Sequence, residues 1–97
     1  MTKDERKHYG RIADLGCIVC LLAGYEHTPC EIHHIRSGAG AGQKSHWSKA
    51  IGLCSSHHRL GGYRVAIHSG IEGFEDAIGM SEVELLAKNL ELLNGTT

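Results

Sequence analysis

Two short pairs of potential metal ligands constrain this chain more than any other feature. Cys17 and Cys20 are separated by two residues, and so are Cys54 and His57. Three thiolates and one imidazole form the closed tetrahedral set that structural Zn²⁺ prefers. A domain of 97 residues has a small core, so a metal crosslink would add stability that it needs. The pairs therefore predict a structural zinc site; the alternative is two buried cysteines with unrelated neighbours.

The cellular compartment bears on how the cysteines are used. The first residues lack the apolar segment of a signal peptide, and no run approaches the roughly 18 apolar residues of a membrane span. We therefore expect a cytoplasmic protein without membrane association, where cysteines are more often metal ligands than disulfides. The remaining cysteine, Cys30, is expected to be a small buried or half-exposed thiol.

Charge is distributed unevenly along the chain, although its net value is only −1. Residues 32–71 contain no acidic side chain, whereas residues 72–97 contain six acids and one base, Lys88. The middle of the chain can therefore present a positive surface to a nucleic acid although the whole is nearly neutral. The bases of that segment are Arg36, Lys44, Lys49, Arg59 and Arg64.

Turn signals and apolar periodicity predict one α+β domain over residues 1–97. Thr2 and Glu5 have the form of a capping box, and Gly16 should end the first helix. The predicted elements are a helix over about 4–15, strands at 31–35 and 49–54, a serine-capped helical turn at 55–60, an extended segment at 63–68 and a short helix at 73–78.

A C-terminal helix is predicted over about 81–93. Ser81 and Glu84 form a second capping-box pattern at its start, and Gly95 follows its end. An apolar stripe at helical spacing is expected to face the core. Its residues are Val83, Leu86, Leu90 and Leu93.

The segment between the two ligand pairs carries further potential ligands. The zinc knuckles at 17–20 and 54–57 enclose a strand with adjacent histidines, His33 and His34, then a glycine-rich loop and a second strand. His58 follows directly after the second knuckle. This order is that of a ββα-metal unit, spanning about residues 31–68, in which a hairpin and a helix hold one divalent ion.

With these motifs the sequence resembles the HNH (His-Me finger) endonuclease superfamily. Within it, the chain is most similar to the Ref-type nucleases, which are phage recombination-enhancement proteins that cut DNA with the help of RecA filaments. The resemblance runs from about Arg11 to Lys88. The segments that carry it are LGCIVC, TPCEIHHIRSG, SHWSKAIGLCSSHHRLGG, AIHSG and GFEDAIGMSEVELL.

The resemblance implies a role for each histidine. His33, His58 and His68 would bind a catalytic divalent ion, and His34 would be the general base that activates water. The asparagine that usually orients this base is missing, and His46 is the best replacement candidate. His68 lies ten residues after His58, so it would have to approach the ion from beyond the helix.

The resulting hypothesis is a phage or prophage endonuclease that hydrolyses DNA phosphodiester bonds. It would contain structural Zn²⁺ and one catalytic ion, which could be Mg²⁺, Mn²⁺, Zn²⁺ or Ni²⁺, and would act in the cytoplasm of a bacterial host, with DNA and a RecA filament as partners. Its DNA contacts would come from Arg36, Lys44, Lys49, Arg59 and Arg64. The alternative hypothesis is a catalytically inactive, zinc-stabilised nucleic-acid-binding module.

Overall fold

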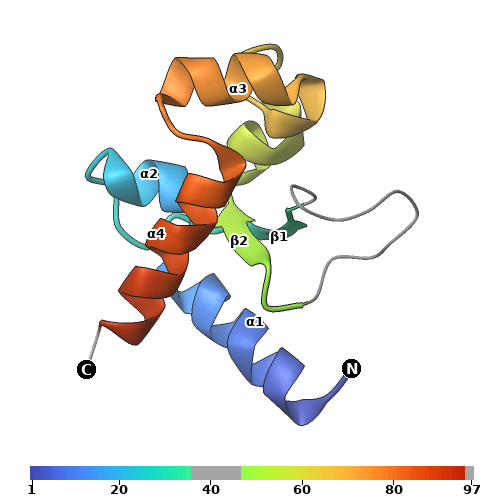
Figure 1. Cartoon of the computed structure of the whole chain (residues 1–97), viewed down its shortest axis with the longest axis vertical. Helices are drawn as coiled ribbons and strands as arrows, with labels where there is room; N and C mark the ends of the chain where they lie inside the picture. The colour runs from blue at the N-terminus through green and yellow to red at the C-terminus, as the bar shows by residue number, and fades with distance from the viewer. Residues whose placement is uncertain (36–46, 96–97) are drawn as a thin grey trace.

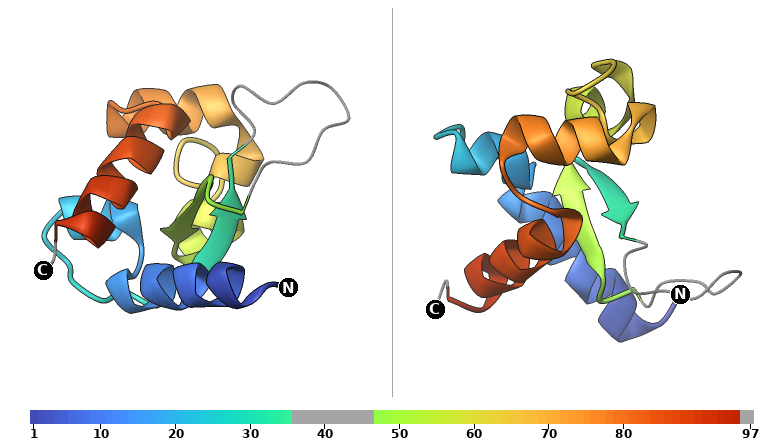
Figure 2. Two further views of the ribbon diagram at one scale, coloured as in Figure 1. Left: turned by 60° about the horizontal axis from the view of Figure 1, so that its bottom comes forward. Right: turned by 45° about the horizontal axis from the view of Figure 1, so that its top comes forward.

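A two-stranded antiparallel sheet lies between α1 on one side and α3 on the other (Figures 1 and 2). The structure is a computed structural model that describes residues 1–35 and 47–95. Among these residues, no helix is long and apolar enough to cross a lipid bilayer. The elements are α1 (Lys3–Leu15), α2 (Ile18–Leu22), β1 (Glu31–His34), β2 (Ala50–Leu53), the π-helical turn η1 (Ser56–Leu60), the 3₁₀ turn η2 (Ile67–Ser69), α3 (Ile71–Ile78) and α4 (Glu82–Asn94).

The pairing of β1 with β2 determines which side chains share a face of the sheet. His33 lies opposite Ile51, and His34 lies opposite Ala50. Since successive side chains of a strand point to opposite faces, Glu31 and His33 project from one face of β1 and His34 from the other. The two adjacent histidines are thereby separated.

The strand β2 is buried on both faces, as its uninterrupted run AIGL requires. Ile51 and Leu53 belong to the larger core cluster, together with Phe74 and Leu85, whereas Ala50 packs with α1 in a smaller one. Gly52 lies against the C-terminal end of α1, because a Cβ atom there would be 2.8 Å from the Gly16 carbonyl oxygen and 3.1 Å from Ile12 Cγ2. The sheet is therefore enclosed on both sides.

The ends of the helices largely follow the predicted signals. The Thr2 hydroxyl accepts a hydrogen bond from the Glu5 backbone N–H, and Gly16 ends α1 with φ of +87°. Both halves of the Ser81–Glu84 capping box are formed. The turn at η1 differs, because Ser55 makes no side-chain cap there.

One prediction about the second half of the chain is wrong, and a second holds only in part. Residues 63–68 are not extended: the Gly62 carbonyl accepts hydrogen bonds from the N–H groups of Val65 and Ala66, and the turn leads into η2. Arg64 has a φ of 70° within this turn. The turn thus brings η2 back against η1.

The buried face of α4 coincides only in part with the predicted apolar stripe, of which Leu93 is buried and Leu86 packs against the core cluster. Val83 is 51% exposed, whereas Glu82 is 2% exposed and Asn89 is fully buried. The carboxylate of Glu82 bonds His33, and its backbone N–H bonds Glu75. These polar partners turn residue 82 inward, so that the helix buries Glu82, Leu85, Asn89 and Leu93.

Two glycines, Gly10 and Gly16, allow a matched test of how α1 ends. At Gly16, φ is positive and an added Cβ would lie 2.7 Å from the Thr28 carbonyl oxygen, whereas at Gly10 it would meet nothing within 4 Å. We expect Gly16→Ala to lower the free energy of unfolding by at least ~1–2 kcal/mol. Gly10→Ala should raise it by about 0.5–1 kcal/mol, because alanine favours helix interiors.

Denaturant unfolding of the zinc-loaded proteins measures both changes. Shifts of the same sign in the two variants would contradict the close approach of Gly16 to Thr28.

Candidate functional site

The four ligands of the two predicted zinc pairs converge in the structure. Their ligand atoms, from Cys17, Cys20, Cys54 and His57, all lie within 4.8 Å of one another. The His57 Nδ1 atom is 3.5 Å from Cys17 Sγ, 3.7 Å from Cys20 Sγ and 3.2 Å from Cys54 Sγ. The sulfurs of Cys20 and Cys54 are 3.9 Å apart.

These separations match the edges of a zinc tetrahedron. Zn–S bonds of about 2.3 Å and Zn–N bonds of about 2.0–2.1 Å imply about 3.8 Å between two sulfurs and about 3.5 Å between sulfur and nitrogen. The donor set, three thiolates and one imidazole, is that of structural zinc sites. We call this cluster the Cys₃His group; it could bind a metal ion such as zinc.

Local structure brings the Cys₃His group together from three places in the chain. Cys17 is the N-cap of α2, where its sulfur accepts a hydrogen bond from the Cys20 N–H. Cys54 follows β2, and His57 lies in η1. Burial raises the pKa of the Cys17 thiol to about 12 and lowers the pKa of His57. A neutral imidazole is thus ready to coordinate, whereas a metal ion binding at Cys17 must displace a proton.

A second group of ligands lies on the other side of the η1 turn. His33, His58 and His68 place one ligand atom each within 4.8 Å of one another. The rings of His58 and His68 have centroids 4.4 Å apart, and His33 lies 5.1 Å from His58. His33 comes from β1, His58 from η1 and His68 from η2. We call this cluster the three-histidine group; it too could hold a metal ion.

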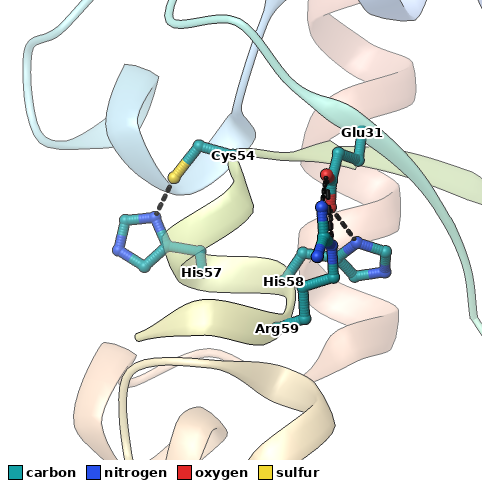
Figure 3. A network of polar contacts seen from close by, with 5 residues as sticks. All are labelled: Glu31, Cys54, His57, His58 and Arg59. Carbon is teal, nitrogen blue, oxygen red and sulfur yellow. Dashed lines mark hydrogen bonds and ion pairs between the residues drawn. The ribbon is translucent and has the colours of Figure 1, made fainter. Parts of the chain in front are cut away.

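The turn η1 separates the two groups because neighbouring side chains on a helix diverge by about 100°. Figure 3 shows His57 directed toward Cys54 and His58 directed the other way, toward Glu31. The turn is wide, since the Gly61 N–H donates to the Ser56 carbonyl, five residues earlier. Two consecutive histidines therefore serve two different groups.

A carboxylate on β1 fixes the orientation of His58. Glu31 Oε1 is 2.8 Å from His58 Nδ1, and Arg59 donates to both carboxylate oxygens of Glu31 (Figure 3). The hydrogen bonds from Arg59 and His58 lower the pKa of Glu31 to about 2, so the carboxylate is ionised at neutral pH. With Nδ1 bonded to Glu31, His58 has Nε2 left for a metal ion.

A second carboxylate, from α4, contacts His33. Glu82 Oε2 lies 2.9 Å from His33 Nε2, and the Glu82 side chain is only 3% exposed. Burial lowers the pKa of His33, while the bond to Glu82 acts in the opposite direction. Two of the three histidines are thus bonded to carboxylates, as metal-binding histidines usually are.

The predicted general base, His34, lies outside the three-histidine group. Its side chain is exposed at the end of β1, where Nε2 is 2.7 Å from the Tyr9 hydroxyl of α1. Its predicted orienting partner, His46, lies outside the described residues.

The predicted DNA-contacting residues are only partly available. Arg59 is bonded to Glu31, and Arg64 Nη1 lies 2.8 Å from Asp76 Oδ2. Lys49 is exposed before β2. Arg36 and Lys44 lie outside the described residues. Contacts of these five residues with DNA remain predictions.

Comparison with known families assigns the chain to one of them. The family described as "Recombination enhancement, RecA-dependent nuclease" matches residues 1–94. The chain belongs to this family. A search of curated proteins finds no significant match. The family's description names a nuclease that depends on RecA and enhances recombination.

Three residues of this RecA-dependent nuclease escaped the sequence interpretation: Glu31, Glu82 and Tyr9. Glu31 was detectable, because it lies two residues before His33 and must share its face of the strand. Glu82 carries no such signal, since an acid in the first turn of a helix is ordinarily explained by the helix dipole. Tyr9 is separated from His34 by 25 residues, so only the tertiary fold reveals their contact.

Mutation tests whether the Cys₃His group binds zinc, with Cys30 as the control residue. Cys54→Ser should lose one tightly held zinc per chain and much of the fold's stability, because a structural zinc contributes directly to folding. Cys30→Ser should retain the zinc, since Cys30 is outside the group and its sulfur contacts the Ile12 carbonyl. Elemental analysis and thermal unfolding, with and without a chelator, measure both effects. Retention of zinc by Cys54→Ser would exclude it as a ligand.

Proposed function

We propose that this RecA-dependent nuclease is an HNH-type endonuclease with a ββα-metal site that cuts DNA. The observation that carries the proposal is the convergence of His33, His58 and His68 next to a separate Cys₃His group. The hairpin β1–β2 and the turn η1 supply the parts of a ββα-metal unit, and η2 contributes the last histidine. In this proposal zinc in the Cys₃His group is structural, and the three-histidine group is catalytic.

The donor set of the three-histidine group suits a divalent ion. Neutral imidazoles favour Zn²⁺, Ni²⁺ or Mn²⁺ over Mg²⁺, and they leave the charge of the ion available to a phosphate. When bound, such an ion supplies Lewis-acid stabilisation of the phosphate and of the departing oxygen. The Glu31 and Glu82 carboxylates hold two of the imidazoles in place, so the site is oriented before the ion arrives.

His34 then takes the proton of the attacking water. Its imidazole is exposed, and an imidazole nitrogen is the group that most often accepts a proton in general-base catalysis. Water oxygen bonds to phosphorus as the bond to the 3′ oxygen breaks, and that oxygen gains a proton. Resemblance to HNH enzymes implies products with 5′-phosphate and 3′-hydroxyl ends.

The alternative, an inactive nucleic-acid-binding module, explains less of the structure. A structural zinc site needs no histidine beyond His57. The module would give no reason for three further imidazoles to meet, or for a carboxylate as buried as Glu82 to bond one of them. We therefore favour catalysis on DNA delivered by a RecA filament, in the cytoplasm of a bacterial host that carries the phage or prophage.

Cleavage of RecA-bound DNA tests the proposal. With Mn²⁺ or Mg²⁺ present, His34→Asn should cut about 10²–10⁴-fold more slowly than the unmodified protein, because general-base catalysis is lost. His27→Asn is the control, since His27 bonds the Asp14 carbonyl and asparagine tolerates its φ of 57°. Equal cleavage by both variants would refute the catalytic role of His34, and no cleavage by the unmodified protein would favour the inactive module.

Measurement of metal affinity tests, independently of cleavage, whether the carboxylates support metal binding by the three-histidine group. Glu82→Gln should weaken binding of Mn²⁺ to the zinc-loaded protein by about 10–100-fold, because His33 loses the carboxylate that orients it. Glu91→Gln, on the exposed side of the same helix, should leave the affinity unchanged; the Glu91 side chain is 70% exposed. Isothermal titration calorimetry measures both. An unchanged affinity in Glu82→Gln would show that this carboxylate does not support the site.

A further inference from the structure

The contact between Tyr9 and His34 has no part in either group of metal ligands. The Tyr9 hydroxyl lies 2.7 Å from His34 Nε2, and the two rings meet edge to face with centroids 5.7 Å apart. Tyr9 packs at its base against the small core cluster that joins α1 to β2. Its hydroxyl is therefore held by the fold at the end of β1, beside an otherwise exposed imidazole.

Strand alternation explains why α1 provides this contact. His33 and His34 project from opposite faces of β1, and Ile32, on the same face as His34, packs against the α1 cluster. The face that carries His34 is thus the face covered by α1. A tyrosine in that helix reaches His34 without approaching His33.

The direction of the hydrogen bond follows from the other neighbour of Tyr9. Glu5 lies one helical turn earlier, and the pKa of Tyr9 is raised by burial and then by the charge of Glu5 and a hydrogen bond to it. A phenol has one proton to donate and oxygen lone pairs to accept. If the Tyr9 proton points to the Glu5 carboxylate, the Tyr9 oxygen is left to accept from His34 Nε2, 2.7 Å away.

This direction of the hydrogen bond would set the tautomer of His34. If Nε2–H donates to the Tyr9 oxygen, the neutral ring carries its lone pair on Nδ1. Among the described residues, no hydrogen-bond partner contacts Nδ1 of His34. In that tautomer the Nδ1 lone pair is the one available to a water molecule, as a general base requires.

We propose that Tyr9 is a positioning residue that holds His34 as the Nε2–H tautomer and aims Nδ1 at the attacking water. The inference rests on the proposed function for the identity of that water. It gives α1 the orienting task for which the sequence lacks the usual asparagine.

Nitrogen NMR of the resting protein tests the tautomer. Long-range ¹H–¹⁵N correlation of ¹⁵N-histidine-labelled, zinc-loaded protein distinguishes the two neutral forms at about pH 8.5, well above the ordinary imidazole pKa of about 6.5. His34→Asn identifies the signal. We expect Nε2–H in the unmodified protein and a shift toward a mixture of tautomers in Tyr9→Phe, which keeps the ring and loses only the hydroxyl. Tyr25→Phe, whose ring is 69% exposed in a loop, should change nothing.

Kinetics provide the second readout. Tyr9→Phe should reduce the cleavage rate at saturating RecA-bound DNA by about 10–100-fold, part of the contribution of a general base. KM and the metal content should stay unchanged, because Tyr9 belongs to neither ligand group.

The failures of the two proposals are distinguishable. An Nδ1–H tautomer in the unmodified protein, or an unaltered signal and cleavage rate in Tyr9→Phe, would overturn the role of Tyr9 while leaving the nuclease assignment intact. Full cleavage by His34→Asn would instead refute His34 as the base, and with it any catalytic role for the Tyr9 contact.

Discussion

The structure around the histidines depends on the closure of the Cys₃His group. A metal ion bound there would tie the start of α2 to the end of β2 and to η1, three segments that a small core alone would hold weakly. His58 directly follows the ligand His57, so the same closure directs His58 toward β1. The Glu31–Arg59 pair then fixes its ring from the opposite side. In this arrangement the residues of the Cys₃His group also position the three-histidine group.

The acidic C-terminal segment, residues 72–97, supplies a carboxyl group that contacts the three-histidine group. Glu82 is buried although its side chain is ionisable, a situation that is unfavourable unless hydrogen-bonding partners are present. Its partner is His33, and the carboxylate of Glu75 accepts its backbone N–H. The helices α3 and α4 therefore meet the hairpin through polar contacts as well as through Phe74 and Leu85. A metal ion bound by the three-histidine group should therefore affect the start of α4, through the bond between His33 and Glu82.

Local signals made much of this fold predictable, and long-range contacts explain the rest. Thr2, Gly16 and the Ser81–Glu84 box act within one turn of a helix, so their effects are legible in the sequence. The Cys-x-x-Cys and Cys-x-x-His pairs are equally local. The inward rotation of α4 was not predictable, because it depends on a bond from Glu82 to a strand 49 residues away. The turn at Arg64 was missed because an apolar run such as VAI also suits a strand.

The charges seen in the structure bear on the dependence on RecA. Sequence alone suggested a basic middle segment, but Arg59 and Arg64 are each engaged by a carboxylate. Arginines that already pair with acids release few counterions from DNA, and counterion release supplies most non-specific affinity. In a chain with a net charge of −1, these two arginines would have to exchange a carboxylate for a phosphate to contact DNA. A nuclease whose arginines are engaged in this way would benefit from a second protein that holds the DNA, which agrees with the RecA dependence in the family's description.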